Sequence, residues 1–285
     1  MPFPFRPPPF TWPEPYQAAA FMSFDIDGEV GFAASGIDHL ENRPAVRSLT
    51  DYELAVGVPR ILRWLDDLHI STTFFVPGRM AELYPQIVRE VLAAGHEIGH
   101  HGHLHLKPDR ISDEEQLSEI RRPLPILEDL IGGPVEGYRT PGWAPSAKTL
   151  GLLREHGFKY DSSLQGHEQP YTTPEGLLEL PGQWVLEDWE LWGSLPYPGA
   201  EYPFASPETA VSLWETHFKA IVADGGLFTM VLHPWIAGRA GYSQVLSSML
   251  RRFQEEHPEV WWTSGREIYR HAERTGQLVP PAQPG

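Results

Sequence analysis

The segment Ala-Ala-Phe-Met-Ser-Phe-Asp-Ile-Asp-Gly, residues 19–28, decides the fold that we expect for this chain. Its apolar and aromatic part, residues 19–24, predicts a buried strand, and Asp25 and Asp27 follow where that strand ends. In an extended chain residues i and i+2 point to the same side, so both carboxylates can face one site while Ile26 turns into the packing. Carboxylates this close repel each other unless a cation or a proton lies between them. The pair therefore indicates a metal site. The alternative interpretation, which suffices for these two residues taken alone, is a solvated Asp-x-Asp turn.

Outward from this strand, short apolar or β-branched runs alternate with longer helical patterns, which is typical of βα units around a parallel sheet. The predicted strands are residues 19–24, 72–76, 97–99, 137–139, 158–161, 227–232 and 260–263. The later predicted helices are residues 146–156, 207–224, 242–257 and 264–275. About seven βα units predict one α/β domain folded as a distorted (β/α) barrel, since single barrels often have about 250 residues.

Several helix boundaries carry local signals. The patterns Thr50-x-x-Glu53 and Ser112-x-x-Glu115 are typical of capping boxes. Gly95 and Gly157 occupy positions where a left-handed residue would end a helix. The prolines of residues 123–125 are expected to break the helix that begins at Ser112.

The composition narrows the chemistry that this chain can perform. It has 38 acidic and 22 basic side chains, a formal net charge of −16, 13 histidines and no cysteine. Disulfides, thiolate metal sites, iron–sulfur clusters and cysteine nucleophiles are therefore excluded. The negative charge disfavours nucleic acids and anionic membranes as partners, because both are repelled over a Debye length of roughly 10 Å. Any metal must be bound by His, Asp or Glu.

The two ends of the chain and one internal segment depart from the βα alternation. We expect a proline-rich arm over residues 1–17, a single catalytic domain over 18–275 and a tail over 276–285. The start lacks the basic and apolar regions of a signal peptide, and no apolar run approaches the roughly 20 residues of a membrane span, so we expect a cytoplasmic protein.

The segment from Gln165 to Ser206 is too long for an ordinary connection and is rich in aromatic residues. Its aromatic side chains include Trp184, Trp189, Trp192, Tyr197 and Tyr202. Two interpretations stay open: the segment covers a substrate, or its aromatic residues fill the core or a subunit interface.

Five of the 13 histidines lie between Gly95 and His105. One interpretation takes residues 96–100 as the H-E-x-x-H motif of a zinc protease, with Glu97 as the base. The glycines around this motif oppose a helix there, and the third histidine of the extended pattern would fall on Leu106. The other interpretation takes His101 and His105 as metal ligands completed by Asp27, which leaves one position open for water. The other three histidines of the run, His96, His100 and His103, are then structural or supporting.

Three short motifs after residue 137 are each compatible with an ordinary structural role. Arg139 follows a short strand in Arg-Thr-Pro-Gly-Trp, Asp161 lies in Tyr-Asp-Ser-Ser-Leu, and His233 ends the apolar strand 227–232. Taken alone, they are a structural arginine, a helix cap and a histidine at a strand end.

Together, and in this order, these five pieces resemble the motifs of the polysaccharide deacetylase family, also known as the NodB-homology or carbohydrate esterase 4 family. The resemblance spans residues 25–234 and implies a NodB-type distorted barrel of about seven strands. It implies Asp27, His101 and His105 as ligands of a divalent metal, with zinc expected. It also implies Asp25 as base, His233 as acid, Arg139 as the residue that orients the base, and Asp161 as the residue that tunes the acid.

Three departures point to one branch of that family. Ile26 separates the two aspartates, Gly102 follows the first metal histidine, and Gly142 precedes Trp143 after the proline of the third motif. These features resemble the branch with cyclic-imide hydrolases, allantoinase-like proteins and intracellular peptidoglycan-deacetylase-like proteins, a branch that implies a homotetramer.

The expected function is metal-dependent hydrolysis of a non-peptide carbon–nitrogen bond in a small-molecule or glycan substrate. Asp25 takes a proton from the attacking water, His233 protonates the leaving nitrogen, and a backbone N–H near Gly142 helps to hold the developing oxyanion. Within this class the substrate is an N-acetyl sugar or a compact cyclic imide or ureide. The alternatives are a zinc metalloprotease that uses Glu97, and a catalytically silent barrel that serves as a binding module.

Overall fold

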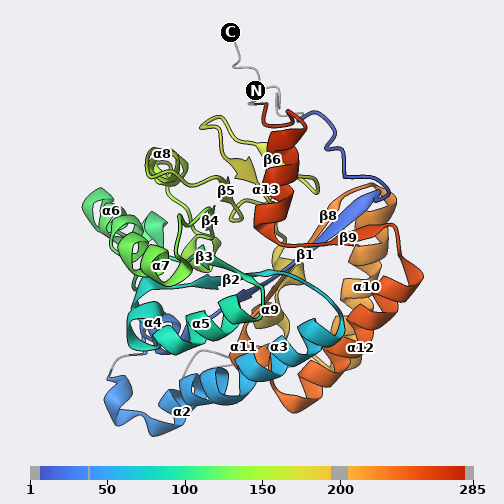
Figure 1. Ribbon diagram of the computed structural model, residues 1–285. Helices are drawn as coiled ribbons and strands as arrows, with labels where there is room; N and C mark the ends of the chain where they lie inside the picture. The colour runs from blue at the N-terminus through green and yellow to red at the C-terminus, as the bar shows by residue number, and fades with distance from the viewer. Residues whose placement is uncertain (1–6, 38, 194–204, 280–285) are drawn as a thin grey trace.

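A curled sheet runs through the centre of the molecule and is surrounded by helices (Figure 1). The computed structural model describes residues 7–37, 39–193 and 205–279. The strand order is β6-β7-β5-β4-β3-β2-β1-β8, and β9 pairs with the first residues of β1. Every pairing is parallel except that of β6 with β7. The α/β class and the distorted barrel that the sequence predicts are confirmed.

All seven predicted strands are present, and two more belong to the sheet. The strands are β1 (Ala18–Asp25), β2 (Thr73–Val76), β3 (Glu97–His100), β4 (Gly137–Tyr138), β5 (Tyr160–Asp161), β6 (Tyr171–Thr172), β7 (Leu178–Glu179), β8 (Leu227–Leu232) and β9 (Val260–Trp262). The sequence did not predict β6 and β7, because strands of two residues are too short to produce a periodic pattern.

Thirteen α-helices occur in the described part of the chain. They are α1 (Gly28–Ala34), α2 (Pro44–Tyr52), α3 (Val58–Asp67), α4 (Gly78–Leu83), α5 (Pro85–Ala93), α6 (Asp113–Arg121), α7 (Pro123–Ile131), α8 (Thr149–Glu155), α9 (Asp188–Trp192), α10 (Pro207–Ala223), α11 (Pro234–Ala237), α12 (Ala240–Glu256) and α13 (Gly265–Arg274). Helices α10 and α12 lie side by side near the β8 edge in Figure 1. No helix of the described residues has both the length and the apolar character that crossing a membrane requires.

Most of the predicted helix boundaries are confirmed. Ser112 caps α6 in a full capping box, and Gly95 and Gly157, with φ angles of 83° and 88°, lie two residues after the ends of α5 and α8. Helix α6 ends at Arg121 and α7 begins at Pro123. The predicted capping box at Thr50–Glu53 is wrong, because Thr50 lies inside α2 and a π-helical turn over residues 53–57 carries the helix on into α3.

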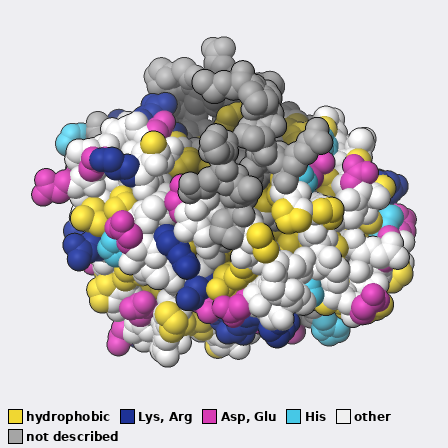
Figure 2. Space-filling model, turned by 90° about the horizontal axis from the view of Figure 1, so that it is seen from above, with side chains coloured by type: hydrophobic (Ala, Val, Ile, Leu, Met, Phe, Trp, Pro, Cys, Tyr) yellow, Lys and Arg dark blue, Asp and Glu magenta, His cyan; other side chains and the backbone are white. Residues whose placement is uncertain are grey.

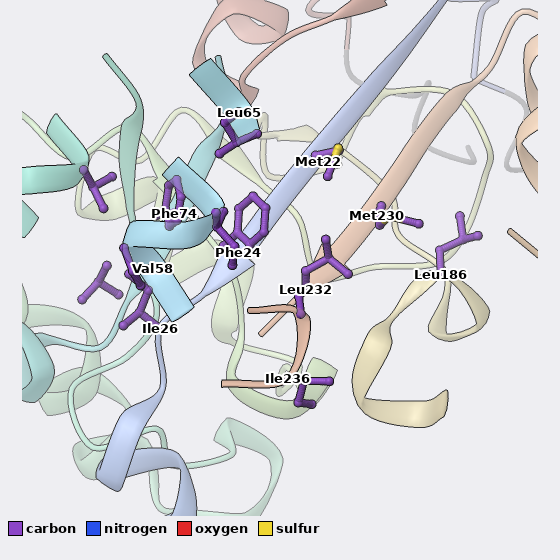
Figure 3. Close-up of a cluster of buried hydrophobic side chains, with 14 of the residues drawn as sticks. Met22, Phe24, Ile26, Val58, Leu65, Phe74, Leu186, Met230, Leu232 and Ile236 are labelled. Atoms are coloured by element: carbon purple, nitrogen blue, oxygen red, sulfur yellow. The ribbon is translucent and has the colours of Figure 1, made fainter. Parts of the chain in front are cut away.

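The alternation along β1 explains where its acidic residues point. The even-numbered residues of this segment pack outward against the helices; they are Ala18, Ala20, Met22, Phe24 and Ile26. Figure 3 draws part of this cluster, in which Phe24 stacks on Phe74 with ring centres 4.8 Å apart. Ala19 and Phe21 belong to a second cluster inside the sheet. Since side chains alternate, Asp25 and Asp27 continue the inward row at its carboxyl end, and Ile26 turns into the packing as predicted.

Residues 7–17 lie against the body of the protein. Phe10 and Trp12 are buried, the Trp12 indole donates to the Gly225 carbonyl at 2.8 Å, and the His271 ring bonds the Thr11 carbonyl at 2.7 Å. Residues 1–6 of the expected arm and 280–285 of the expected tail lie outside the described residues. The division into arm, domain and tail stays a prediction.

A close approach between two segments makes Gly57 sensitive to substitution. A Cβ on Gly57 would overlap the backbone carbonyl oxygen of Pro234, at the start of α11. We expect Gly57→Ala to lower the free energy of unfolding by about 1–3 kcal/mol, because backbone atoms cannot rotate out of the way. Gly151 in α8 is the matched control, since a Cβ there meets nothing within 4 Å, and Gly151→Ala should be neutral or stabilising. Urea unfolding of both variants tests this expectation, and equal stabilities would contradict it.

Candidate active site and metal centre

The carboxyl ends of four strands bring six of the seven predicted site residues together. Asp25 ends β1 and Asp27 follows it, His101 and His105 follow β3, Arg139 follows β4, and His233 follows β8. All of these except Arg139, which lies behind Asp25, line a pocket of about 430 Å³. Five aromatic side chains form much of its remaining wall: Phe32, Trp143, Trp184, Trp189 and Trp235.

Asp27, His101 and His105 form a group that fits a divalent metal ion. Their candidate ligand atoms all lie within 4.8 Å of one another. Asp27 Oδ1 is 3.5 Å from His101 Nε2, and Asp27 Oδ2 is 3.4 Å from His105 Nε2. Asp27 Oδ1 is buried and makes no hydrogen bond to the described residues. A buried carboxylate oxygen without a donor, facing two imidazole nitrogens, is what a bound cation would satisfy.

The hydrogen bond of His101 and the burial of His105 suit metal binding. His101 Nδ1 lies 2.8 Å from the Arg139 carbonyl oxygen, and since a carbonyl can only accept, Nδ1 carries a hydrogen and Nε2 is the nitrogen that can ligate a metal. Burial lowers the pKa of His105 to about 4, so this ring is neutral at neutral pH. Burial opposes ionisation of Asp27, but His105 and His101 outweigh it and hold the pKa of Asp27 below its usual range.

Arg139 fixes the position of Asp25. Its Nη1 donates to Asp25 Oδ1 at 2.8 Å and to Ser23 Oγ at 2.7 Å. Its other nitrogens donate to the carbonyl and hydroxyl oxygens of Ser162 at 3.1 and 3.0 Å. Asp25 Oδ2 then lies 3.6 Å from His101 Nε2, at the edge of the metal group. Because Arg139 is 1% exposed, water does not compete for these hydrogen bonds.

His233 is held by Asp188, a residue that the sequence did not single out. Asp188 Oδ1 lies 2.8 Å from His233 Nδ1, and Asp188 Oδ2 accepts the backbone N–H of His233 at 2.9 Å. Burial disfavours the charged ring, but the adjacent Asp188 carboxylate outweighs burial and raises the pKa of His233 well above its usual value. His233 Nε2 faces the centre of the site, 3.6 Å from Asp27 Oδ2.

The structure places Asp161 away from His233, the residue that the resemblance implied it tunes, and that role of Asp161 stays a prediction. Asp161 ends β5, and four strands separate β5 from β8 in the sheet. Its carboxylate accepts from the Ser163 hydroxyl at 2.7 Å, and burial raises its pKa to about 6. Asp188, rather than Asp161, is the carboxylate that contacts His233. The only signal for Asp188 in the sequence is the acidic pair at 187–188 within the aromatic segment.

The protease alternative is wrong because Glu97 is not on a helix. It begins strand β3, away from the carboxyl end where the metal group lies. The Thr73 and Tyr160 hydroxyls donate to its carboxylate at 2.7 and 2.9 Å. The remaining histidines of this run lie outside the metal group; His100, for example, bonds the Ile120 carbonyl at 3.0 Å.

Both interpretations of the aromatic segment find support in its described part. Trp184, Glu187 and Trp189 line the pocket, whereas Trp192 stacks on Tyr242 in the core with ring centres 4.2 Å apart. The carboxylate of Glu187 accepts the Trp143 indole N–H at 2.9 Å, and burial raises the pKa of Glu187 to about 8. The remaining expected residues, Tyr197 and Tyr202, lie outside the described residues.

One face of the molecule can be compared with the surface that a polyanionic partner would need. On the face drawn in Figure 2, acidic and basic side chains are interspersed over the described surface. A nucleic-acid-binding surface usually gathers its basic residues into a patch or stripe.

Comparisons with known proteins agree with the geometry. Residues 45–160 match the family model described as polysaccharide deacetylase. The chain is 26% identical to the peptidoglycan deacetylase of Helicobacter pylori, over 86% of this chain and 92% of that protein. It is 27% identical to a peptidoglycan deacetylase-like protein of Gibberella zeae, over 87% and 84% of the two chains.

Solved structures share the fold over nearly the whole length. A crystal structure from Mycobacterium smegmatis, assigned to the polysaccharide deacetylases, superposes with a TM-score of 0.91 at 32% identity and covers 98% of both chains. An allantoinase structure superposes with a TM-score of 0.80 at 21% identity and covers 94% of both chains, a likeness that concerns the fold.

Proposed function

Because the chain belongs to the polysaccharide deacetylase family, we propose that it hydrolyses the amide bond of an N-acyl substrate with a divalent metal held by Asp27, His101 and His105. One observation carries the proposal. The Asp–His–His group shares a single pocket with a carboxylate anchored by Arg139 and a histidine anchored by Asp188.

The bound metal would supply Lewis-acid polarisation of the substrate carbonyl and make water more acidic. Two neutral imidazoles and one carboxylate are the donor set of catalytic zinc sites, which favours zinc among the divalent ions. Zinc, a cytoplasmic location and a homotetramer stay predictions.

Asp25 is the proposed general base. Its Oδ1 is engaged by Arg139 at 2.8 Å, which leaves Oδ2, on the His101 side, to take a proton from the attacking water. Arg139 therefore acts as a positioning residue. Its charge is neutralised by Asp25 and its hydrogen bonds to Ser162 hold it in place.

His233 is the proposed general acid. When the carbon–nitrogen bond breaks, Nε2 of the protonated ring gives its proton to the leaving nitrogen, so the amine departs neutral. Asp188 holds the ring orientation through Nδ1 and stabilises the charged form. A backbone N–H near Gly142 is proposed to stabilise the developing oxyanion, a contribution typically worth roughly 3–4 kcal/mol.

The size and walls of the pocket favour a second candidate substrate, a cyclic imide or ureide. A cavity of about 430 Å³ with five aromatic side chains in its wall suits a compact, flat ring. An extended glycan would instead need a groove that continues beyond the metal group.

A hydrolysis screen separates these substrates and tests the metal dependence. We expect the zinc-loaded protein to hydrolyse at least one of N-acetylglucosamine oligomers, succinimide, hydantoin and allantoin. Dialysis against a chelator should reduce the rate at least 100-fold, because the Lewis acid supplies several kcal/mol of transition-state stabilisation. One equivalent of zinc should restore the rate.

Metal content measured by mass spectrometry accompanies each assay. Full activity in metal-free protein would refute the metal-dependent mechanism. Zinc-loaded protein that hydrolyses none of these compounds would support the silent binding module instead.

A further inference from the structure

Lys107 is a cation in the pocket to which the described residues supply no counter-ion. Its side chain lines the pocket and is half-buried, and no acceptor among the described residues bonds its ammonium group. The other two cationic side chains of the site are neutralised, because Arg139 lies 2.8 Å from Asp25 and His233 lies 2.8 Å from Asp188.

Gly142 provides the space that this lysine occupies. A Cβ at Gly142 would lie 2.6 Å from Lys107 Cε and 3.2 Å from Nζ, and the φ angle of 61° itself disfavours other residues. The lysine stem therefore lies on the bare backbone of the turn at residues 141–143. This packing holds the ammonium group beside the turn whose N–H is proposed to face the oxyanion.

The sheet order separates Lys107 from the proposed acid. Lys107 follows β3 and the turn at 141–143 follows β4, whereas His233 follows β8 beyond β2 and β1. Glu187, which precedes α9, and the exposed Glu190 on α9 line the pocket on the His233 side. A substrate whose leaving nitrogen faces His233 thus presents its acyl part to Lys107. An anionic group on the amine would instead meet the exposed carboxylate of Glu190.

A half-buried ammonium group without a counter-ion, in a pocket lined partly by aromatic side chains, is less screened than a surface charge, so it discriminates between charged and neutral ligands. Exposed charges more than a Debye length of roughly 10 Å away are largely screened, so a cation inside the pocket can outweigh the overall net charge of −16. We propose that the substrate is an amide whose acyl group carries a second carboxylate, a half-amide of a dicarboxylic acid, and that Lys107 binds this carboxylate. This inference rests on the proposed function.

Two substrates with the same amine and nearly the same shape test it. One is the N-succinyl amide, and the other is its neutral analogue in which the terminal carboxylate is a carboxamide. We expect wild-type protein to favour the N-succinyl amide in kcat/KM by about 10- to 100-fold, the range for a hydrogen bond between charged groups. Lys107→Met keeps the stem on Gly142 and should remove most of this preference, whereas Lys107→Arg should keep it.

Lys148→Met is the control, because Lys148 is an exposed lysine paired with Asp113 outside the pocket. It should leave the rates on both substrates unchanged. Equal losses on the two substrates in Lys107→Met would overturn the inference and assign Lys107 to the oxyanion. Hydrolysis of neither substrate by wild-type protein, together with a negative metal-dependent screen, would instead overturn the proposed function itself.

Discussion

Replacing Asp25 by Asn is expected to lower kcat by about 10²- to 10⁴-fold, the range that general base catalysis contributes, while the protein keeps its metal. The asparagine side chain has nearly the same shape, and its oxygen can still accept from Arg139, so the fold and the metal group should persist. It cannot take a proton from the attacking water. Because Asp25 is not one of the three proposed ligands, the loss should appear in kcat rather than in metal content.

Steady-state kinetics and metal analysis on the same preparation check this expectation. Asp129→Asn is the matched control, since Asp129 is an exposed acid on α7 outside the pocket, and it should leave kcat unchanged. Metal-loaded Asp25→Asn with a kcat within tenfold of wild type would assign the base to another residue. Loss of metal in this variant would make Asp25 a ligand instead.

The fold was predictable where a pattern repeats within one element. In β1 the apolar row, the following acidic pair and the intervening Ile26 predicted both the strand and the side to which Asp25 and Asp27 point. The same reasoning failed at Thr50–Glu53, because a capping pattern cannot reveal that a π-helical turn carries α2 on into α3. A local sequence pattern indicates which conformations a segment can adopt. Contacts with neighbouring segments determine which of them it adopts in the folded protein.

The residues of the candidate site were likewise predictable from the sequence only in part. Asp27, His101 and His105 follow strands whose ends a parallel sheet brings to one edge, so topology alone predicts that they meet. Asp161 also lies at a strand end, but four strands separate β5 from β8 in the sheet, and another carboxylate contacts His233. Asp188 comes from the short helix α9, within a segment that shows no period. Its contact with His233 depends on tertiary packing, which no local pattern encodes.

Asp188→Asn should therefore have the second large effect, and its signature is a shift in pH dependence. The proposed acid works only when His233 is protonated. Its pKa in the folded protein is raised well above the usual value, so the protonated form is present at neutral pH and is lost as the pH rises through the raised pKa. Removing the Asp188 charge removes the main cause of that increase. The alkaline limb of kcat should move to lower pH, and kcat at pH 8 should fall about 100-fold or more.

The variant Asp161→Asn tests which aspartate raises the pKa of His233. The structure favours Asp188 for this role, whereas the resemblance implied Asp161. The two aspartates are both fully buried, so either variant can lose stability, and the activity of folded protein alone is compared. Only Asp188 lies 2.8 Å from His233 Nδ1, so only Asp188→Asn should move the alkaline limb. Titration of the His233 ring by NMR in zinc-loaded protein measures its pKa directly. A lowered pKa in Asp161→Asn together with an unchanged one in Asp188→Asn would return the tuning role to Asp161, through a coupling along the sheet rather than a contact.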